Sequence, residues 1–590
     1  MPSSDDPLMP ARERRHDRRL GTLAAFVISV TFAGCGSVGM EGVGGPPAQP
    51  PTPPKPPVTT LVTLSGVATF SRVPTSGAGL DYAATVSKPI RNAIVQVRSS
   101  SASTVLYQSS TDALGNWSIS APRSANVNLV VMAELGTPTA VNTKVVDNTT
   151  SDAIYSVYLA KTTTTSDETG IVINATSGWT GSSYGAARTS APFAILDTIY
   201  QAQQLIRSAD AGVSFPLLVV EWSPNNSAAT IKTSAFNPTT GRIAILGKED
   251  EDTDEFDTHV IAHEWGHWHE QFFSRSDSLG GPHGFGDILD ETVAFSEGWG
   301  NAFSGMVNRN PIYIDTSGVQ QANSDMLDLE ANAVAKTAVV GGGDPRTVDG
   351  GWSELSVQEL LWDAFDGTGG ISDADADGVA LGFAPLYQVV IGQQKTFSGF
   401  TSIYSFLYHL KLQNPSIAAA MTTLEANENI GPHDAYQQTT PGLARYTQVP
   451  TSGTALTTDV DGNSLTTYDD YGPMSATSAG NRLYNRLLFS AVAPSTGTFR
   501  IRATPLTGSH DLILRRPTLF SPNVADAVYG GSEYLDFNAT AGTTVVFSVG
   551  SFTTATNATG VTPFQIQFGT PAQVGKPQID PQPVMPSANG

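Results

Sequence analysis

Short runs of alternating apolar and polar residues, separated by Gly, Pro, Ser and Asn, fill the part of the chain that begins near residue 60. This alternation has the two-residue period of a β-strand with one buried face, and turn residues between such runs are typical of an all-β module. The pattern therefore predicts a β-sandwich over residues 60–162. Its expected strands lie at 65–70, 93–98, 117–120 and 128–133.

A helical period replaces this alternation further along the chain. At residues 193–208 (FAILDTIYQAQQLIRS), apolar side chains recur every three or four positions, as on one face of a helix. After a connecting segment at 163–185, we therefore expect a helix-containing domain over residues 186–447. Four further apolar segments in it predict a mixture of strands and helices, at 217–220, 242–246, 357–365 and 402–412.

Strand signals return over residues 448–570, where short apolar runs such as 499–503 and 545–549 are separated by Gly, Ser, Thr and Asn. We expect a second β-sandwich there, followed by a disordered tail at 571–590 that is rich in Pro. The predicted fold class is thus multidomain: a β-sandwich, an α+β domain and a C-terminal β-sandwich.

The beginning of the chain has the features of an export signal. Five arginines between Arg12 and Arg19 precede an uncharged stretch at 20–34, which has the length of a signal-peptide core. That stretch runs into the sequence TFAGC at 31–35, which resembles a bacterial lipobox. The resemblance implies that residues 1–35 are a lipoprotein signal and that Cys35, the only cysteine in the chain, accepts the lipid.

Residues 36–59 are rich in Gly and then in Pro, a composition that favours extended polyproline II over a packed core. We expect this linker to hold the protein off a bacterial membrane. The outer membrane is favoured, because Gly36 stands where inner-membrane lipoproteins carry aspartate, while a secreted form and the export route stay open.

Charge narrows the possible partners. The 590 residues include 54 acidic and 32 basic side chains, which gives a net charge of −22. A chain this acidic repels nucleic acid and anionic membrane surfaces. We therefore expect no nucleic-acid partner.

The strongest chemical signal is the segment His263-Glu264-Trp265-Gly266-His267. Two histidines four residues apart lie on one face of a helix, so both imidazoles can bind one metal ion. Glu264 follows the first histidine and is placed to accept a proton from an attacking water. The segment therefore predicts two ligands and a general base, although a structural pair of histidines on a core helix is the alternative.

A catalytic zinc site needs a third protein ligand. Metzincins supply it as a histidine, but Glu270 and Phe273 stand where their motif requires Gly and His. The segment at 294–303 (AFSEGWGNAF) instead resembles the Asn-Glu-Gly-Phe-Ala segment of aminopeptidase-type gluzincins. The resemblance implies a zincin-like α+β domain in which Glu297 binds Zn²⁺ together with His263 and His267.

Glu291 is the alternative third ligand, because Asp290-Glu291-Thr292-Val293-Ala294 resembles the corresponding segment of thermolysin-like enzymes. Residues six apart on a helix point about 120° away from each other, so Glu291 and Glu297 cannot both bind one ion. We favour Glu297. The segment between the two helices is longer than in either family.

Other residues near the motif have less specific patterns. Residues 241–247 (GRIAILG) predict a strand. The gluzincin resemblance implies that this strand is the edge of a sheet and pairs with a peptide substrate. An ordinary sheet strand is the alternative. The stretch 249–257 has seven acidic residues in nine, and we favour an interaction with the helix dipole over calcium binding. The candidate donors to a reaction oxyanion are His283, which we prefer, Tyr387, His409 and His433.

A second cation site is considered at Asp373, Asp375 and Asp377, whose alternation with a following Gly resembles the start of a calcium-binding loop. The twelfth position of such a loop should be glutamate and is Ala384. A solvated acidic loop is therefore favoured over Ca²⁺ binding.

The two β-modules also resemble known families. The segment 111–117 (TDALGNW) resembles the hairpin of carboxypeptidase-regulatory-like domains, which implies a spacer. The segments 483–487, 510–514 and 541–543 together resemble pre-peptidase C-terminal domains, which are appended to secreted bacterial proteases.

Taken together, these features predict a zinc peptidase that acts on a protein or peptide substrate outside the cytoplasm. Endopeptidase action is favoured, because the Gly-X-Met-Glu-Asn segment of aminopeptidase-type gluzincins is absent. The alternative is a non-catalytic surface binding or adhesion protein built on a zincin scaffold. The intact Glu264 favours the enzyme, since a scaffold needs ligands but no general base. A monomer is assumed.

Overall fold

The computed structural model of the chain describes most residues between 60 and 575. The described stretches are 60–284, 286–331, 348–371, 376–437, 445–461, 481–483, 485–506, 511–517, 523–525, 531–552 and 561–575. The predicted signal segment with Cys35, the linker and the calcium candidates Asp373 and Asp375 lie outside the described residues. The chain divides into two compact units, Met1–Val58 and Thr59–Gly590, and every described residue belongs to the second.

The N-terminal β-region is sandwich-like, with two sheets that share one apolar core. In β7 (Asn116–Pro122) every second side chain is buried, as the alternating sequence predicts. Leu64 of β1 (Leu61–Arg72) lies in the same core as Val95 of β5 (Ala93–Ser99). The first sheet has the order β12 (Glu168–Ala175), β1 and β4 (Val86–Pro89), with β7 also paired to β1, and a separate hairpin joins β2 (Thr75–Ser76) to β3 (Gly79–Leu80).

Strand β12 lies in the segment 163–185, which we expected to be only a connection. It pairs with β1 in parallel, with Gly66 opposite Ile171 and Phe70 opposite Ala175. Its outward residues are exposed and only Ile173 and Ala175 are buried. The apolar run in this strand is limited to residues 171–173.

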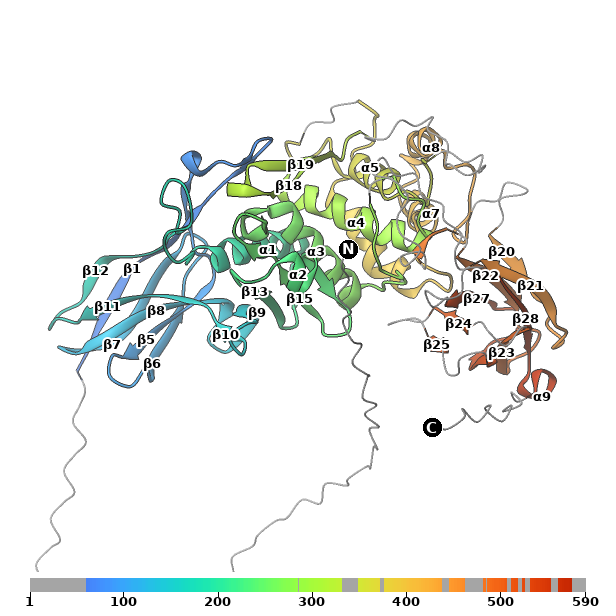
Figure 1. The fold of residues 1–590 in the computed structure, drawn as a ribbon, viewed down its shortest axis with the longest axis horizontal. Coiled ribbons are helices and arrows are strands. Elements are labelled where there is room, and N and C mark those ends of the chain that lie inside the picture. The colour runs from blue at the N-terminus through green and yellow to red at the C-terminus, as the bar shows by residue number, and fades with distance from the viewer. Residues whose placement is uncertain are drawn as a thin grey trace, which may run out of the picture. The chain divides into compact units, whose positions relative to one another are not determined.

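The second sheet continues from the N-terminal β-region into the helical region (Figure 1). The junction is a parallel pair of strands, in which Leu218 lies opposite Thr143 and Glu221 opposite Val146. The two regions therefore share backbone hydrogen bonds across residue 185. The strand order is β14 (Ala235–Asn237), β15 (Arg242–Ile245), β13 (Leu218–Trp222), β9 (Ala140–Asp147), β8 (Asn126–Thr137), β5 and β6 (Val105–Ser110), with β10 (Ala153–Ile154) on β9 and β11 (Ser156–Thr162) on β8.

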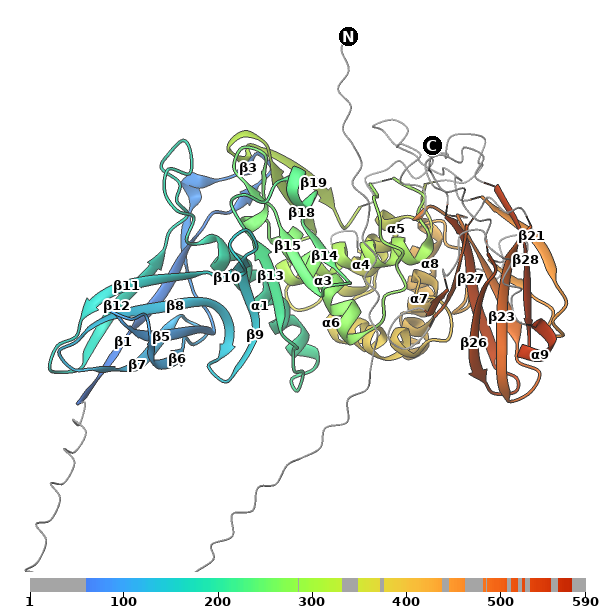
Figure 2. The same ribbon diagram turned by 60° about the horizontal axis from the view of Figure 1, so that its bottom comes forward.

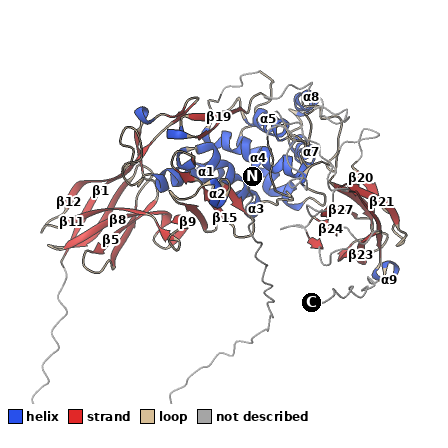
Figure 3. Ribbon diagram, viewed as in Figure 1, coloured by secondary structure: helices blue, strands red, loops and turns tan. Residues whose placement is uncertain are grey.

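The helical region packs on this sheet. Helix α1 (Ala191–Ala209) confirms the helical period predicted at 193–208, and its apolar face lies in the same core as β13. Figure 3 shows the larger helices gathered in one region. They are α3 (Thr258–Phe273), α4 (Glu291–Asn308), α5 (Glu354–Phe365), α7 (Ile403–Gln413) and α8 (Ala418–Asn427), with the shorter α2 (Ala228–Ile231) and α6 (Phe383–Gln388). A small sheet of β16 (Gly247–Lys248), β17 (Asp252–Thr253), β18 (Ile312–Ser317) and β19 (Asn323–Asp328) lies beside them.

Two further sheets form the C-terminal β-region, several strands of which are visible in Figure 2. Their inner faces share a core in which Phe489 of one sheet contacts Phe564 of the other, with ring centroids 6.1 Å apart. One sheet has the order β20 (Tyr446–Gln448), β22 (Arg486–Val492), β27 (Thr544–Phe552), β24 (Asp511–Arg516) and β25 (Asn523–Ala525); the other has β21 (Leu456–Asp461), β28 (Val561–Gly569), β23 (Gly497–Pro505) and β26 (Glu533–Ala539), followed by α9 (Pro571–Val574).

A buried ion pair joins this region to the helical region. Asp290 accepts a hydrogen bond from the backbone N–H of Thr292 and so caps α4. The same carboxylate binds the guanidinium of Arg486 on β22, 2.5 Å away, and both side chains are almost fully buried. Within the described residues, no helix is both long and apolar enough to cross a membrane.

Candidate metal centre

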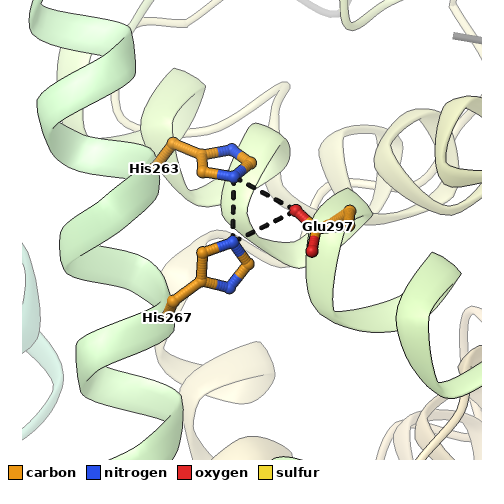
Figure 4. Close-up of side chains that lie close together, drawn as sticks. All are labelled: His263, His267 and Glu297. Atoms are coloured by element: carbon orange, nitrogen blue, oxygen red, sulfur yellow. Dashed lines mark hydrogen bonds and ion pairs between the residues drawn. The ribbon is translucent and has the colours of Figure 1, made fainter. Parts of the chain in front are cut away.

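Helices α3 and α4 bring three ionisable side chains together. His263 and His267 extend from one face of α3, as the four-residue spacing predicts, and Glu297 extends from α4 toward them (Figure 4). Glu297 Oε2 lies 3.2 Å from His267 Nε2 and 3.4 Å from His263 Nε2, and the two imidazole nitrogens are 2.9 Å apart. His263 and Glu297 are each less than 10% exposed.

Hydrogen bonds at the far side of the ring fix the tautomer of His263. Its Nδ1 lies 2.8 Å from the side-chain oxygen of Asn301, whose amide nitrogen donates to Gln358 Oε1 at 2.9 Å. Because the Asn301 oxygen can only accept, Nδ1 of His263 carries the proton. Its Nε2 therefore presents a lone pair to His267 and Glu297.

The ring of His267 is held in the same way. Its Nδ1 lies 3.2 Å from Ser296 Oγ, and the Ser296 hydroxyl donates to Glu270 Oε2 at 2.6 Å. Since the hydroxyl proton points to Glu270, Ser296 accepts from Nδ1 of His267. In their neutral forms, both imidazoles thus direct an Nε2 lone pair at the same point.

Three converging electron pairs fit a bound cation. Ligand atoms about 2.05 Å from a tetrahedral ion lie about 3.3 Å from one another, which matches the observed separations. This buried His-His-Glu cluster can therefore hold a metal ion. Its nitrogen and carboxylate donors are those that divalent transition metals prefer.

The local charges reinforce the cluster. Burial alone would raise the pKa of Glu297, but His283 and His267 outweigh it and hold that pKa well below the usual value. Burial likewise opposes protonation of His267, yet Glu297 raises the pKa of this imidazole to about 9. The carboxylate is therefore ionised, and a positive charge is favoured at this point.

Close packing of the two helices depends on a glycine in α4. A Cβ atom on Gly300 would lie 2.8 Å from Cε1 and Nδ1 of His263, which is shorter than a normal contact. The absence of a side chain at this position therefore leaves room for the imidazole between α3 and α4.

Glu264 lies beside these residues and contacts a strand. Its Oε2 accepts a hydrogen bond of 2.6 Å from the backbone N–H of Phe236, on β14. The strand predicted at 241–247 is confirmed as β15, but it lies between β13 and β14, so its assignment as the sheet edge was wrong. The edge strand is β14, a three-residue strand too short for its alternation to be recognised in the sequence.

The cluster opens on a cavity of about 970 Å³. His283 lies on its wall, with Nε2 3.4 Å from Glu297 Oε2 and 3.8 Å from Glu354 Oε2. Burial opposes the protonation of His283, but these two carboxylates raise its pKa to about 9. Tyr313 of β18 also lines the cavity, and its ring centroid is 6.3 Å from that of His263.

The remaining candidates lie elsewhere. Glu291 points away from the cluster and forms a buried ion pair with Arg445, 3.1 Å away. The cavity is not lined by the other three candidate oxyanion donors, Tyr387, His409 and His433. Tyr387 packs on His269, and His409 lies against Phe397. His433 forms an ion pair with Glu425. Of the predicted calcium loop, Asp377 is described, and it accepts a hydrogen bond from the N–H of Val379.

The sequence did not identify the contributions of Asn301 and Tyr313 to this site. Asn301 lies four residues after Glu297, so the helical period could have placed it on the same face of α4. Tyr313 follows the helix on a short strand, and no local pattern directs its ring to His263.

No family model matches the chain, and no curated protein matches its sequence. Among solved structures, there is a weak, distant similarity to the pre-peptidase C-terminal domain of a collagenase from Bacillus anthracis, with 10% identity, 21% of this chain and 93% of that chain covered, and a TM-score of 0.14. A 9R-lipoxygenase from Cyanothece PCC8801 is similar at 11% identity and a TM-score of 0.12. The match covers 27% of this chain and 26% of the lipoxygenase chain. These TM-scores are too low for either similarity to carry an argument.

Proposed function

We propose that this protein is a zinc-dependent peptidase that hydrolyses peptide bonds of proteins or peptides. The observation that carries the proposal is the convergence of two imidazole lone pairs and one carboxylate at a cavity that also contains Glu264. Two histidines and one glutamate are a ligand set of catalytic zinc sites, which leave a further position open.

A zinc ion held by His263, His267 and Glu297 would supply Lewis acidity, which polarises a scissile carbonyl and lowers the pKa of a water. Glu264 is the residue that accepts the proton of the attacking water and passes it to the leaving amine. Its position one residue after His263 and its place on the cavity wall support this role. Tyr313 and His283, also on the wall, are the candidate donors to the oxyanion.

The edge strand supports a peptide substrate. Phe236 pairs with Ile243 on one side of β14, and its N–H is directed to the other side, toward Glu264. An extended peptide that adds to this edge would use the same backbone groups. Because this mode needs no free terminus, endopeptidase action remains our preference, in a cavity of about 970 Å³.

The decisive experiment combines metal analysis with protease assays on the purified protein. We expect about one zinc per chain, cleavage of casein or of a peptide library, and loss of cleavage after treatment with a chelator. Glu264→Gln should retain zinc and lose at least about a thousandfold in kcat/KM, because only the proton acceptor is removed. Glu251→Gln, an exposed glutamate outside the cavity, is the matched control and should cleave normally.

A protein that binds zinc, with wild type and Glu264→Gln equally inert on every substrate, would instead fit the surface binding protein on a zincin scaffold. A protein without zinc would contradict both alternatives.

We also propose export and lipid attachment at Cys35, which the arginine-rich start and the sequence TFAGC at 31–35 support. Cells grown with a labelled fatty acid should label the wild-type chain and leave Cys35→Ala unlabelled. Equal labelling of both would refute the anchor without affecting the peptidase proposal.

A further inference from the structure

Three aspartates on the cavity wall form a cluster separate from the His-His-Glu site. Asp252 lies on β17, Asp254 in the short 3-10 turn η2 (Asp254–Phe256) before α3, and Asp315 on β18. One carboxylate oxygen from each lies within 4.8 Å of those of the other two. We call these three residues the aspartate cluster.

One oxygen of each carboxylate is buried and accepts no hydrogen bond from a donor group. Asp254 is only 2% exposed, and the Oδ1 atoms of Asp252, Asp254 and Asp315 are all buried without a partner. A buried carboxylate oxygen that accepts nothing costs free energy, and proteins rarely contain three of them at one point. By contrast, both oxygens of the neighbouring Asp257 are used, because they accept from the N–H and hydroxyl of Thr316.

The surrounding charges do not compensate the cluster. The charged groups that act on Asp252, Asp254 and Asp315 are other aspartates, and no basic side chain is among them. Burial, together with Asp252 and Asp325, raises the pKa of Asp315 to about 7. The cluster therefore requires either bound protons or a bound cation.

The geometry favours a cation, and calcium in particular. Three atoms no more than 4.8 Å apart place a central ion no more than about 2.8 Å from each, a limit that includes calcium–oxygen distances. Calcium suits buried oxygens better than magnesium, because magnesium gives up its water ligands reluctantly. An all-carboxylate donor set suits a hard cation rather than zinc. Asp325, exposed and opposite Asp315 in the β18–β19 register, can add a fourth carboxylate.

A basic side chain of a substrate fits this position less well. The three Oδ1 atoms have almost no exposed surface, so an ammonium or guanidinium group cannot reach between them. A single dehydrated ion can instead bind one oxygen from each of the three carboxylates.

We infer that the aspartate cluster is a calcium site that stabilises the strand bordering the candidate metal centre. The connection is direct: the Ser234 hydroxyl donates to Asp254, and Ser234 Oγ accepts from the N–H of Leu246 at 2.9 Å. Ser234 immediately precedes β14, whose Phe236 contacts Glu264. The ion fixes the start of α3, β18 and the entrance to β14 relative to one another.

Calcium titration of the purified, zinc-loaded protein by calorimetry tests this site without any activity measurement. We expect binding with a Kd between about 10 μM and 1 mM, that is, between the weakest sensor sites and the sites of extracellular modules. Calcium at 5 mM should raise Tm by about 1–4 °C for a folded unit of this size. Asp315→Asn and Asp254→Asn should each weaken calcium binding at least tenfold and abolish the rise in Tm.

Three variants make the test specific. Asp325→Asn changes an exposed residue that folding does not require, and it should weaken binding about threefold to tenfold. Glu251→Gln, which removes a charge next to Asp252, and Asp377→Asn, in the other candidate calcium loop, should bind calcium as the wild type does.

Two results would overturn the inference. One is a wild-type protein that binds no calcium up to 10 mM, in which case the carboxyls share protons. The other is calcium binding that Asp315→Asn and Asp325→Asn leave unchanged. Because calcium binding and zinc-dependent cleavage are measured separately, either proposal can fail alone.

Discussion

At the scale of single residues, the site depends on groups that turn the Nε2 atoms of two imidazoles toward Glu297. Asn301 and Ser296 each accept a hydrogen bond from a ring Nδ1, so that both Nε2 atoms face Glu297. Such outer partners orient metal-binding histidines and raise their basicity. The sequence motif supplies the ligands, while these neighbours on α4 determine which nitrogen is available.

Gly300 gives a sharp test at this scale. In Gly300→Ala the new methyl group would lie 2.8 Å from the ring of His263, so the ring has to leave its position. We expect metal affinity to fall at least about tenfold, with helix content by circular dichroism preserved. Zinc content after dialysis against a weak chelator measures the effect.

The control for this variant is Gly392→Ala, where no atom lies within 4 Å of the added Cβ. It should keep its zinc. Full zinc content in Gly300→Ala would show that His263 does not need its observed position to bind the ion.

At the scale of elements, the sequence predicted what local periodicity encodes. The helix at 193–208 follows from apolar spacing, and the motif helix follows from the four-residue spacing of its histidines; α1 and α3 confirm them. The choice between Glu291 and Glu297 depends on how α4 is rotated against α3. Local sequence does not fix that rotation, which is set by packing and by the pairing of Glu291 with Arg445.

The short strands could not be predicted from the sequence, because their positions also depend on contacts with distant segments. Strand β14 has three residues, so it has no measurable period, and its pairing depends on β15. Tyr313 and Asp315 reach the cavity because β18 returns past α3 after the end of α4. Contacts between segments far apart in the chain carry no local signal.

The N-terminus of α4 offers a prediction about stability and pH. Burial would raise the pKa of Asp290, but Arg486 outweighs it and lowers that pKa below the ordinary value. A depressed folded pKa stabilises the protein above the unfolded pKa, and this contribution disappears as the pH falls through the folded pKa. Asp290→Asn should therefore cost about 3–5 kcal/mol at pH 7, because Arg486 is left buried and unpaired.

Urea unfolding at pH 7 and at about pH 3 measures this contribution, and the difference from wild type should shrink at the lower pH. The control is Asp536→Asn in the pair with Arg500, where Asp536 is 40% exposed and a loss below about 1 kcal/mol is expected. Equal losses of unfolding free energy in Asp290→Asn and Asp536→Asn would show that burial of the ion pair does not determine its contribution to stability.

At the scale of the whole molecule, the N-terminal β-region is more than the spacer that its resemblance implied. Strand β9 pairs with β13, and the core that begins at Val62 continues without interruption through α1, α3 and α4. The aromatic ring of Tyr155 also lies 5.3 Å from that of Trp222, across the same junction. The predicted boundary at 185 therefore crosses a sheet and a core.

This continuity predicts that residues 60–185 cannot be removed. In a shortened chain that begins at residue 186, β13 loses its parallel partner and becomes an exposed edge, and the buried side of α1 faces solvent. We expect that chain to be insoluble, or soluble without zinc and without a cooperative thermal transition. A chain that begins at residue 60 is the control and should bind zinc and unfold cooperatively. If instead the chain from 186 keeps its zinc and melts within a few degrees of the control, the shared sheet contributes little, and the N-terminal β-region is a spacer after all.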